Sequence, residues 1–473
     1  MNAVRPITMR PSDPRHSEMR RKVSTAVIAG LGRTGYSCAA YLRARGWRLA
    51  VTDTRTAPPE LARLRALDPE LPVHLGGLDT ALLDEAVCVV ASPGLPLSHP
   101  FFDEARRRGI EIVGDVELFA LAADAPVVAV TGTNGKSTVT TLVGRMAERA
   151  RLKVRVGGNL GEPVLDLLGA SQRDPEHTEL YVLELSSFQL EATRSLDLEA
   201  AAVLNVTADH LDRYPTLEDY AAAKARIFAR CDTAIVNLDD PLVLAMPLPG
   251  QPTLSFSLRA TSAADFALAS GVGPRGLPGA AWLVRRNEPL LAVSELKIRG
   301  LHNVANALAA LALGEALGLP LEAMLAELRS FAGLPHRSQW VAEVHGVTYV
   351  NDSKGTNVGA TLAAVAGLPG PLVAILGGDG KQQDFAPLAA AFRGKVRHAV
   401  LIGRDREAIG RALEGVASLE RCDSLEEAVR AAARAARPGD TVLLSPACAS
   451  FDMFRDYAHR GEVFTAAVKE LAA

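Results

Sequence analysis

The chain has few of the features that mark secreted, membrane-spanning or nucleic-acid-binding proteins. Its 473 residues include five scattered cysteines without a CxxC pair, which indicates a reducing compartment and argues against a thiolate metal site. No apolar run reaches the roughly 18 residues that a membrane-spanning helix needs. The formal net charge is only −3, so no basic surface for nucleic acid is expected. We therefore expect a cytoplasmic protein with neither a nucleic-acid nor a membrane partner.

The first residues also lack the apolar core of a secretory signal. The stretch MNAVRPITMRPSDPRHSEMRRK carries Arg and Pro instead, so we expect residues 1–22 to form a disordered basic tail. The rest of the chain, with 48% hydrophobic and 22% charged residues overall, is typical of a soluble globular protein. Its length predicts two to four domains at roughly 100–200 residues each.

Short apolar runs alternate with amphipathic helical patterns along nearly the whole chain, which is typical of parallel βαβ units. The predicted fold class is therefore α/β, with three domains at 23–118, 119–333 and 334–473. Strands are expected in the first domain near 26–30, 48–53, 87–91 and 110–113. The central domain is expected to hold strands at 127–132, 181–187, 201–206 and 233–237, a small antiparallel patch within about 251–300, and helices at 302–318 and 321–330.

The stretch AVIAGLGRTG places Gly30, Gly32 and Gly35 on the GxGxxG spacing, between an expected strand and an expected helix. Asp53 ends the next strand, LAVTD. In dinucleotide-binding proteins such glycines form a tight turn, the helix N-terminus binds a pyrophosphate, and the acid contacts a ribose hydroxyl. Taken alone, this stretch favours an NAD-dependent oxidoreductase.

A second glycine-containing loop, VAVTGTNGKSTVTTLVGRM, opens the central domain. Lys136 and Ser137 stand where a P-loop has its phosphate-binding lysine and its magnesium-binding hydroxyl. The loop is a variant, because Val130 occupies the first glycine position of the usual GxxxxGK[ST] pattern. It predicts an ATP site.

Glu184 and His210 follow two expected strands of the same domain, where an open α/β sheet places its ligands. Either residue alone is more common as a surface or capping residue, but together they predict metal ligands. The helical pattern around Lys224 favours, by itself, a solvated lysine. Lys354 and Lys381 follow expected strands of the third domain, which suggests that this domain faces an anion.

The motifs that carry this chemistry occur in one order: TGTNGKST, ELSSFQLE, NVTADHLDRYP, GLHNVANALAA, LPHRSQ, NDSKGTN, GGDGKQQDF and LSPACASFDMFRDYAHRG. The series resembles the Mur ligases of peptidoglycan synthesis, and among them the members that add D-glutamate, over residues 23–473. The resemblance implies a Rossmann-like UDP-binding domain, a central P-loop ATPase domain with a mostly parallel sheet, and a C-terminal Rossmann-like domain for ATP and the amino acid. It implies a monomer that joins D-glutamate to UDP-N-acetylmuramoyl-L-alanine through an acyl phosphate.

The resemblance also implies the site residues. ATP would be bound by Gly132, Thr133, Asn134, Gly135, Lys136, Ser137, Thr138, Asn303, Asn306, Arg337 and Asp352. The uridine diphosphate would be bound by Gly30, Leu31, Gly32, Arg33, Thr34, Asp53, Thr54, Arg55, Ser92, Pro93, Gly94 and Asn159. D-glutamate would be bound by Lys354, Thr356, Lys381, Ser450, Phe451 and Tyr457. Two Mg²⁺ ions would be bound by Ser137, Glu184, His210 and Lys224, and the catalytic set would be Lys136, His210, Lys224, Arg337 and Lys354.

Lys224 would carry a carbamate, which supplies two hard oxygens where an ammonium group would repel Mg²⁺. Asn303 and Asn306 would read the adenine, although an Asn at a helix start is also a common cap. Phe451 and Tyr457 replace the Leu and Phe usual in the family, so contacts around D-glutamate are expected to differ in detail.

Three other functions are weighed against this one. An NAD-dependent oxidoreductase would leave the P-loop and the third domain unexplained. A sister ligase would add another amino acid, although the SPACASFDMF segment favours D-glutamate. A non-catalytic nucleotide-binding regulator would be expected to lose Lys136, Glu184, His210 or Lys224, and all four are present.

Overall fold

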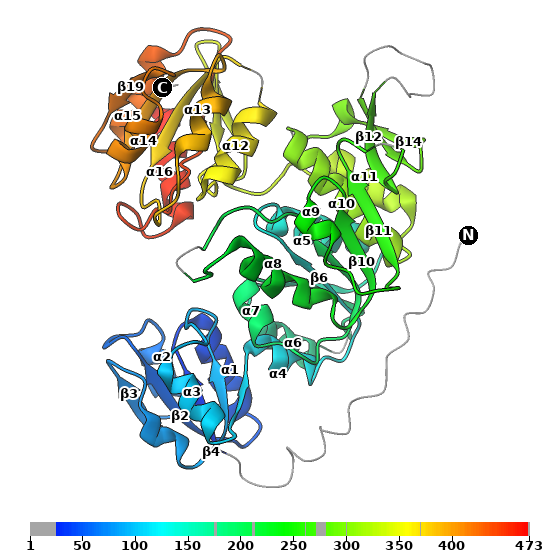
Figure 1. Ribbon diagram of the computed structural model, residues 1–473, viewed down its shortest axis with the longest axis vertical. Helices are drawn as coiled ribbons and strands as arrows, with labels where there is room; N and C mark the ends of the chain where they lie inside the picture. Colours follow the sequence, from blue (N-terminus) through cyan, green and yellow to red (C-terminus); the bar gives the residue numbers. More distant parts are fainter. Residues whose placement is uncertain are drawn as a thin grey trace.

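The computed structural model describes residues 25–174, 177–210, 213–260, 262–270, 281–298, 300–368 and 370–471. These residues form three separate β-sheets flanked by helices, coloured from blue through green to red along the chain in Figure 1. The expected tail at 1–22 lies outside the described residues. No helix within the described ranges is long and apolar enough to cross a membrane.

The first sheet is parallel, with the strand order β3-β2-β1-β4-β5. Its strands are β1 (Thr25–Ala29), β2 (Arg48–Asp53), β3 (Val73–Leu75), β4 (Ala86–Ala91) and β5 (Glu111–Val113). The helices are α1 (Arg33–Arg43), α2 (Leu61–Leu67), α3 (Pro100–Arg107), α4 (Asp115–Ala120) and the short 3-10 helix η2 (Thr80–Leu83). Residues 26–29 of β1 belong alternately to two different hydrophobic clusters, which explains why all four are apolar.

The central sheet has nine strands in the order β14-β13-β12-β11-β10-β9-β6-β8-β7, parallel from β7 to β12 and antiparallel from β12 to β14. The expected antiparallel patch is thus confirmed. The strands are β6 (Val127–Thr131), β7 (Val154–Gly158), β8 (Leu180–Glu184), β9 (Leu198–Val203), β10 (Cys231–Asn237), β11 (Thr253–Ser257), β12 (Phe266–Ser270), β13 (Ala281–Arg285) and β14 (Glu288–Ala292).

Helices cover this sheet on both faces: α5 (Lys136–Arg149), α6 (Val164–Arg173), α7 (Ser187–Glu191), α8 (Leu217–Ala225), α9 (Pro241–Leu244), α10 (Leu301–Ala316) and α11 (Leu321–Ser330), with the 3-10 helices η3 (Arg226–Phe228) and η4 (Val293–Glu295). The strand expected at 181–187 ends earlier, at Glu184, because Ser186 caps α7 in a capping box with Gln189.

The third sheet has the order β15-β16-β20-β17-β18-β19, with an antiparallel hairpin at β15-β16 and parallel pairing elsewhere. Its strands are β15 (Gln339–Val344), β16 (Val347–Asn351), β17 (Leu372–Gly377), β18 (Val396–Ile402), β19 (Ser418–Arg421) and β20 (Thr441–Leu444). Its helices are α12 (Val358–Gly367), α13 (Ala386–Phe392), α14 (Arg406–Ala412), α15 (Leu425–Ala435) and α16 (Tyr457–Leu471). The fold class is therefore confirmed: three α/β domains with mostly parallel sheets.

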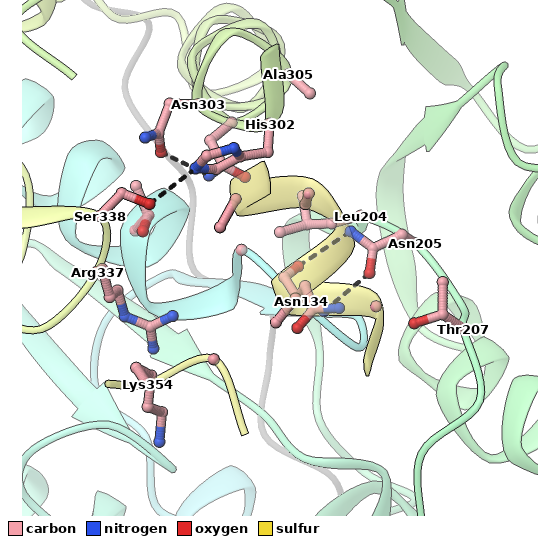
Figure 2. A pocket seen from close by; sticks show the side chains of 18 of the residues that line it. Asn134, Leu204, Asn205, Thr207, His302, Asn303, Ala305, Arg337, Ser338 and Lys354 are labelled. Carbon is pink, nitrogen blue, oxygen red and sulfur yellow. Dashed lines mark hydrogen bonds between the residues drawn. The ribbon is translucent and has the colours of Figure 1, made fainter. Parts of the chain in front are cut away.

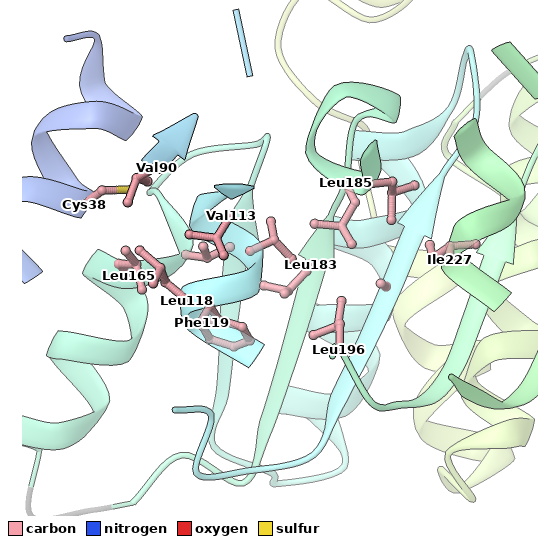
Figure 3. Packing of buried hydrophobic residues seen from close by; sticks show 14 of the residues in the cluster. Cys38, Val90, Val113, Leu118, Phe119, Leu165, Leu183, Leu185, Leu196 and Ile227 are labelled. Carbon is pink, nitrogen blue, oxygen red and sulfur yellow. The ribbon is translucent and has the colours of Figure 1, made fainter. Parts of the chain in front are cut away.

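The first two domains share one hydrophobic cluster. Cys38 of α1, Phe119 of α4 and Leu165 of α6 all belong to it (Figure 3). Ser37 donates a hydrogen bond of 2.6 Å to Asp166 across the same contact. The third domain meets the central one partly through polar groups, for example Arg337 on Ser137. The arrangement brings the carboxyl ends of the first two sheets to neighbouring cavities.

Candidate active site

Both glycine-containing loops lead directly into a helix whose first backbone amides have no side-chain cap. The N-cap of α1 is Gly32 and that of α5 is Gly135, and neither offers a side-chain acceptor. The unpaired amides and the positive end of the helix dipole favour an anion at each place. Each loop follows a strand of a parallel sheet, β1 or β6.

A cavity of about 530 Å³ lies at the first loop. We call it the carrier pocket. Its lining includes all the residues expected for the uridine diphosphate except Leu31: Gly30, Gly32, Arg33, Thr34, Asp53, Thr54, Arg55, Ser92, Pro93, Gly94 and Asn159. Leu31 is buried, and its amide donates to Asp53 instead. Leu95 of the first domain and Gly158, Gly161, Pro163 and Gln189 of the central domain complete the lining, so two domains build this pocket.

Asp53 is bound within its own turn. Its carboxylate accepts hydrogen bonds from the Leu31 amide at 2.6 Å and from the Arg55 guanidinium at 2.7 and 2.9 Å. Burial by itself would raise the pKa of Asp53, but the hydrogen bonds from Arg55 and Leu31 outweigh it and lower the pKa. A fourth hydrogen bond comes from the Arg55 amide at 2.8 Å, so all lone-pair sites of the carboxylate are used to hold the glycine turn in shape.

A second cavity, of about 260 Å³, lies between the second loop, α10 and the third domain (Figure 2). We call it the nucleotide pocket. Among the residues expected for ATP, its lining includes Asn134, Gly135, Thr138, Asn303, Asn306, Arg337 and Asp352. The expected Gly132, Thr133, Lys136 and Ser137 belong to the same loop and the first turn of α5.

Several residues of this pocket were not anticipated from the sequence. Asn205 accepts a hydrogen bond from the Asn134 amide at 2.8 Å and donates one to the Asn134 carbonyl at 3.1 Å, which fixes the P-loop (Figure 2). His302 and Phe256 also line the cavity. Asn205 and His302 lie inside the motifs NVTADH and LHNVAN, so the sequence could have indicated them as pocket residues. Phe256 is an ordinary strand residue, and no motif marks it.

Lys136 is half-buried in the P-loop, where its ammonium group donates to the carbonyls of Gly132 and Thr133, both at 2.9 Å. Burial lowers the pKa of Lys136, and the nearby Glu184 carboxylate opposes that shift. Next to it, the Ser137 hydroxyl donates to Glu184 and accepts from Arg337 at 2.6 Å. Burial would raise the pKa of Glu184, but Lys136, Ser137 and other donors outweigh it and lower the pKa, so the carboxylate is charged.

One side chain links the carrier pocket to the P-loop. Asn159, which lines the carrier pocket, donates a hydrogen bond of 2.7 Å to Glu184 beside the P-loop. The end of a carrier-bound substrate can therefore lie within reach of the P-loop. Sequence spacing gave no hint of this contact, because β7 and β8 are joined by a long connection through α6.

Lys224 is not the solvated lysine that its helical pattern favours. Only 1% of its surface is exposed, and its Nζ donates to the Gly132 carbonyl at 3.0 Å. Burial, followed by the charge of Lys136, lowers the pKa of Lys224 well below its ordinary value. Its Nζ lies 4.2 Å from the centre of the Tyr220 ring, and the His210 ring lies 6.2 Å from that of Tyr220. The structure thus brings Lys224 and His210 to the same aromatic side chain.

These side chains fit the metal chemistry expected of them. An uncharged buried amine is the form of lysine that reacts with carbon dioxide to give a carbamate, and Ser137 and Glu184 offer the hard oxygens that Mg²⁺ prefers. No cluster of three or more His, Cys, Asp and Glu side chains lies within the part of the chain that the structure describes. A magnesium site here would therefore depend on the Ser137 hydroxyl and a modified Lys224.

The third domain brings its own basic group to the nucleotide pocket. Lys354 lines that cavity, and its Nζ lies 3.8 Å from the centre of the Tyr457 ring. Burial, followed by the charge of Arg337, lowers the pKa of Lys354 to about 8. Asp352 beside it accepts hydrogen bonds from Ser445 and Ser338 at 2.8 and 3.0 Å, and burial raises its pKa to about 6.

The other residues expected for D-glutamate lie on neighbouring loops. The turn with Lys381 and the loop with Ser450 and Phe451 are joined where Asp379 and Ala449 exchange backbone hydrogen bonds at 3.0 and 2.8 Å. Thr356 follows Lys354 in the loop before α12, and its amide donates to the Lys354 carbonyl. Phe451 is 74% exposed and does not yet pack on the site.

Arg460 of α16 holds these loops together, and sequence analysis did not identify it. Its guanidinium is fully buried and donates to the Ser353 hydroxyl and carbonyl at 3.0 and 2.8 Å, and to the Cys448 carbonyl at 3.1 Å. Burial lowers the pKa of Arg460 to about 10. An arginine in a polar helix normally reads as solvent-exposed, so no sequence signal pointed to this role.

Each of the three domains matches a domain family of the Mur ligases. Residues 24–114 match the Mur ligase MurD-like N-terminal domain, residues 130–314 the Mur ligase middle domain, and residues 336–448 the Mur ligase glutamate ligase domain. Two solved structures share the fold. MurC, the UDP-N-acetylmuramate-alanine ligase of Thermotoga maritima, is 19% identical, with a TM-score of 0.59 over 94% of this chain and 99% of that one. MurF of Acinetobacter baumannii is 17% identical, with a TM-score of 0.56 over 95% and 92%.

Curated relatives are much more similar in sequence. The UDP-N-acetylmuramoylalanine--D-glutamate ligase of Nitrosococcus oceani is 50% identical over 450 residues, which are 95% of this chain and 97% of that protein. The ligases of the same name from Thiobacillus denitrificans and Pseudomonas aeruginosa are 51% and 50% identical, over 94% of this chain and 96% and 98% of their own. Similarity of this extent across all three domains shows that the chain belongs to the Mur ligase family.

Proposed function

We propose that this chain joins D-glutamate to the alanine carboxylate of UDP-N-acetylmuramoyl-L-alanine, with ATP converted to ADP and phosphate. The observation that carries the proposal is the roughly 50% identity to curated D-glutamate ligases over nearly the whole chain. The two adjoining cavities support it, because one suits a diphosphate carrier and the other a nucleotide. The reaction belongs to cytoplasmic peptidoglycan precursor synthesis.

The carrier pocket would bind the UDP end of the substrate. The amides at the start of α1 would receive the diphosphate, and the Asp53–Arg55 turn would receive the nucleoside. Asn159 would guide the far end of the substrate toward Glu184. An NAD site uses the first two of these features as well, so the GxGxxG turn with Asp53 reports a diphosphate and a nucleoside but does not identify a redox cofactor.

The P-loop would hold the triphosphate while the alanine carboxylate attacks the γ-phosphorus. A carboxylate is a poor electrophile, so this step forms an acyl phosphate and releases ADP. Both reactants are anionic, and Lys136, Arg337 and Lys354 would offset their repulsion and align them. Arg337 reaches the P-loop from the third domain, where it already contacts Ser137 at 2.6 Å. Asn303 and Asn306 would contact the adenine, and Asp352 the ribose.

Two Mg²⁺ ions are proposed, one at Ser137 and Glu184 and one at His210 and a carbamate on Lys224. When bound, they would neutralise phosphate charge and orient the γ-phosphoryl group. The short contact between Ser137 and Glu184 places two oxygen ligands together, and the depressed pKa of Lys224 suits carbamate formation.

The amine of D-glutamate would then attack the acyl phosphate, and phosphate would leave from the tetrahedral intermediate. Lys354 and Thr356 precede α12, whereas Lys381, Ser450, Phe451 and Tyr457 come from three other segments that would surround the amino acid. The pKa of Lys354, lowered to about 8, leaves this lysine largely protonated at neutral pH, as binding of an anion requires.

The decisive experiment is phosphate release with ATP, Mg²⁺, UDP-N-acetylmuramoyl-L-alanine and a panel of amino acids. We expect turnover with D-glutamate and little with L-alanine, L-lysine or diaminopimelate. Reactions without an amino acid control for simple ATP hydrolysis. Turnover with L-lysine or diaminopimelate but not D-glutamate would favour a sister ligase and overturn the specificity proposed here.

We also propose domain limits of 23–118, 119–333 and 334–473 and a monomeric state. Limited proteolysis followed by mass spectrometry tests the limits, with first cuts expected near 119–126 and 331–338. Light scattering tests the monomer, and a mass of about twice the 50.0 kDa chain would contradict it.

A further inference from the structure

Arg213 forms hydrogen bonds both to the carrier pocket and to α7 of the central domain, and it is not among the expected site residues. Its guanidinium donates to the Pro93 carbonyl at 2.7 Å and to the Glu191 carboxylate at 2.7 Å. Pro93 lines the carrier pocket in the first domain, whereas Glu191 ends α7 in the central domain. Its side chain is only 12% exposed, so these hydrogen bonds lie largely outside bulk solvent.

The same arginine fixes the position of His210. The amides of Arg213 and Tyr214 both donate to the His210 carbonyl, at 2.9 and 3.0 Å. The Arg213 guanidinium lies 4.0 Å from the centre of the Phe188 ring, and the His210 ring packs edge-on against that ring at 4.8 Å. The backbone and an aromatic ring thus tie His210 to Arg213.

The residues just before His210 are tied to the P-loop. The Thr133 hydroxyl donates a hydrogen bond of 3.2 Å to the Thr207 carbonyl and accepts one of 3.0 Å from the Thr207 amide. Asn205 exchanges two hydrogen bonds with Asn134. Asn205 and Thr207 are therefore attached to the P-loop, and His210 is attached through Arg213 to the carrier pocket.

We propose that Arg213 is a positioning residue that couples occupation of the carrier pocket to the arrangement of His210 and the P-loop. The inference rests on the proposed function, since the carrier-bound substrate is taken to be a UDP-sugar peptide. A ligand that orders Pro93 strengthens the Pro93–Arg213 hydrogen bond and so favours one position of His210 and Thr207. By thermodynamic linkage, nucleotide binding must favour carrier binding by the same factor.

The test is calorimetric binding of UDP-N-acetylmuramoyl-L-alanine, with and without a saturating non-hydrolysable ATP analogue and Mg²⁺. In the unaltered enzyme we expect the analogue to tighten binding about 5-fold or more. In Arg213→Met this ratio falls toward one, and the ratio isolates the coupling from the weaker carrier binding that loss of the Pro93 hydrogen bond causes without the analogue. Arg213→Lys keeps the positive charge on a single nitrogen and so retains part of the ratio, and Glu191→Gln lowers it less than Arg213→Met.

Arg230→Met is the matched control, because Arg230 pairs with Asp197 within the central domain and touches neither pocket. It should leave the ratio unchanged. Thermal unfolding of each variant shows whether it is folded. An unchanged ratio in a folded Arg213→Met protein, or a ratio of one in the unaltered enzyme, overturns the coupling. Failure of the unaltered enzyme to bind the UDP substrate at all refutes the proposed function instead.

Discussion

Replacing Gly35 by alanine tests the tight turn of the first glycine motif. A Cβ at Gly35 would lie 1.9 Å from the Gly30 carbonyl oxygen and 3.1 Å from the Ser92 hydroxyl. Because a Cβ essentially never approaches another heavy atom closer than 3.0 Å, α1 and the turn must separate by about 1.1 Å, the difference between 3.0 and 1.9 Å. The obstacle is a backbone atom of a residue at φ +93°, which has little freedom to move.

Two opposing terms set the size of the effect. Alanine in a helix is favoured over glycine by about 1 kcal/mol, whereas forcing an atom into a packed region costs about 1–3 kcal/mol. The steric term should be at the upper end, because backbone meets backbone, so a net loss of about 2 kcal/mol is expected. The first two domains share a core, so the unfolding unit spans roughly 310 residues. At about 2.1 cal/mol/K of unfolding entropy per residue, the melting temperature should fall by roughly 3 °C.

Gly32→Ala is the matched control. A Cβ at Gly32 meets nothing within 4 Å and its φ is −92°, but Gly32 lines the carrier pocket. Scanning calorimetry with steady-state kinetics should therefore show a raised KM for the UDP substrate in both variants and a lowered melting temperature in Gly35→Ala alone. An unchanged melting temperature and KM in Gly35→Ala would refute the close contact at the turn.

Three further predictions concern the reaction centre. Lys136→Met should abolish phosphate release while calorimetric binding of the UDP substrate stays nearly unchanged, and loss of both would contradict two separate pockets. Lys224→Ala should leave almost no phosphate release, because the buried amine beside Gly132 cannot be replaced by solvent; full activity would exclude a metal ligand there. Asp352→Asn should gain stability relative to the unaltered enzyme as the pH rises from about 4 to 6. The folded pKa of Asp352, about 6, lies above its ordinary value of 3.8, so between these pH values the folded state holds a proton that the unfolded state has lost, and the stability of the unaltered enzyme falls as the pH rises. Thermal midpoints at pH 4 and pH 7 measure this, and a pH-independent difference would contradict the buried carboxylate.

Much of the fold was predictable, because both faces of the parallel strands are covered. Strand β1 is apolar from residue 26 to residue 29 since alternate residues pack into different clusters, and such a run is visible without any structure. Strands β3 and β7 were not anticipated. The first has only three residues, and the second is only half-buried and ends in two glycines, so neither gives a continuous apolar run.

The burial and contacts of single side chains were less predictable than the motifs in which they occur. Lys224 was expected to be solvated on its helical pattern, but the structure buries it against Gly132 and Tyr220. Helical periodicity shows which residues share a face and not what covers that face. Arg213 and Arg460 escaped notice for the same reason, since an arginine buried by hydrogen bonds to carbonyls has the same sequence pattern as one in water.

Local structural motifs follow from the sequence alone. They are two glycine turns that precede uncapped helices, a lysine and a serine in the first turn of α5, and polar residues at strand ends. These depend on backbone conformations that span a few residues, so short motifs encode them. Which of these motifs come into contact depends on the tertiary structure. It brings Arg337 to Ser137, Asn159 to Glu184 and Arg213 to Pro93. Such contacts join residues that are far apart in the chain. The burial of these side chains and their distances from other charged groups set their pKa values, and no local sequence pattern contains that information.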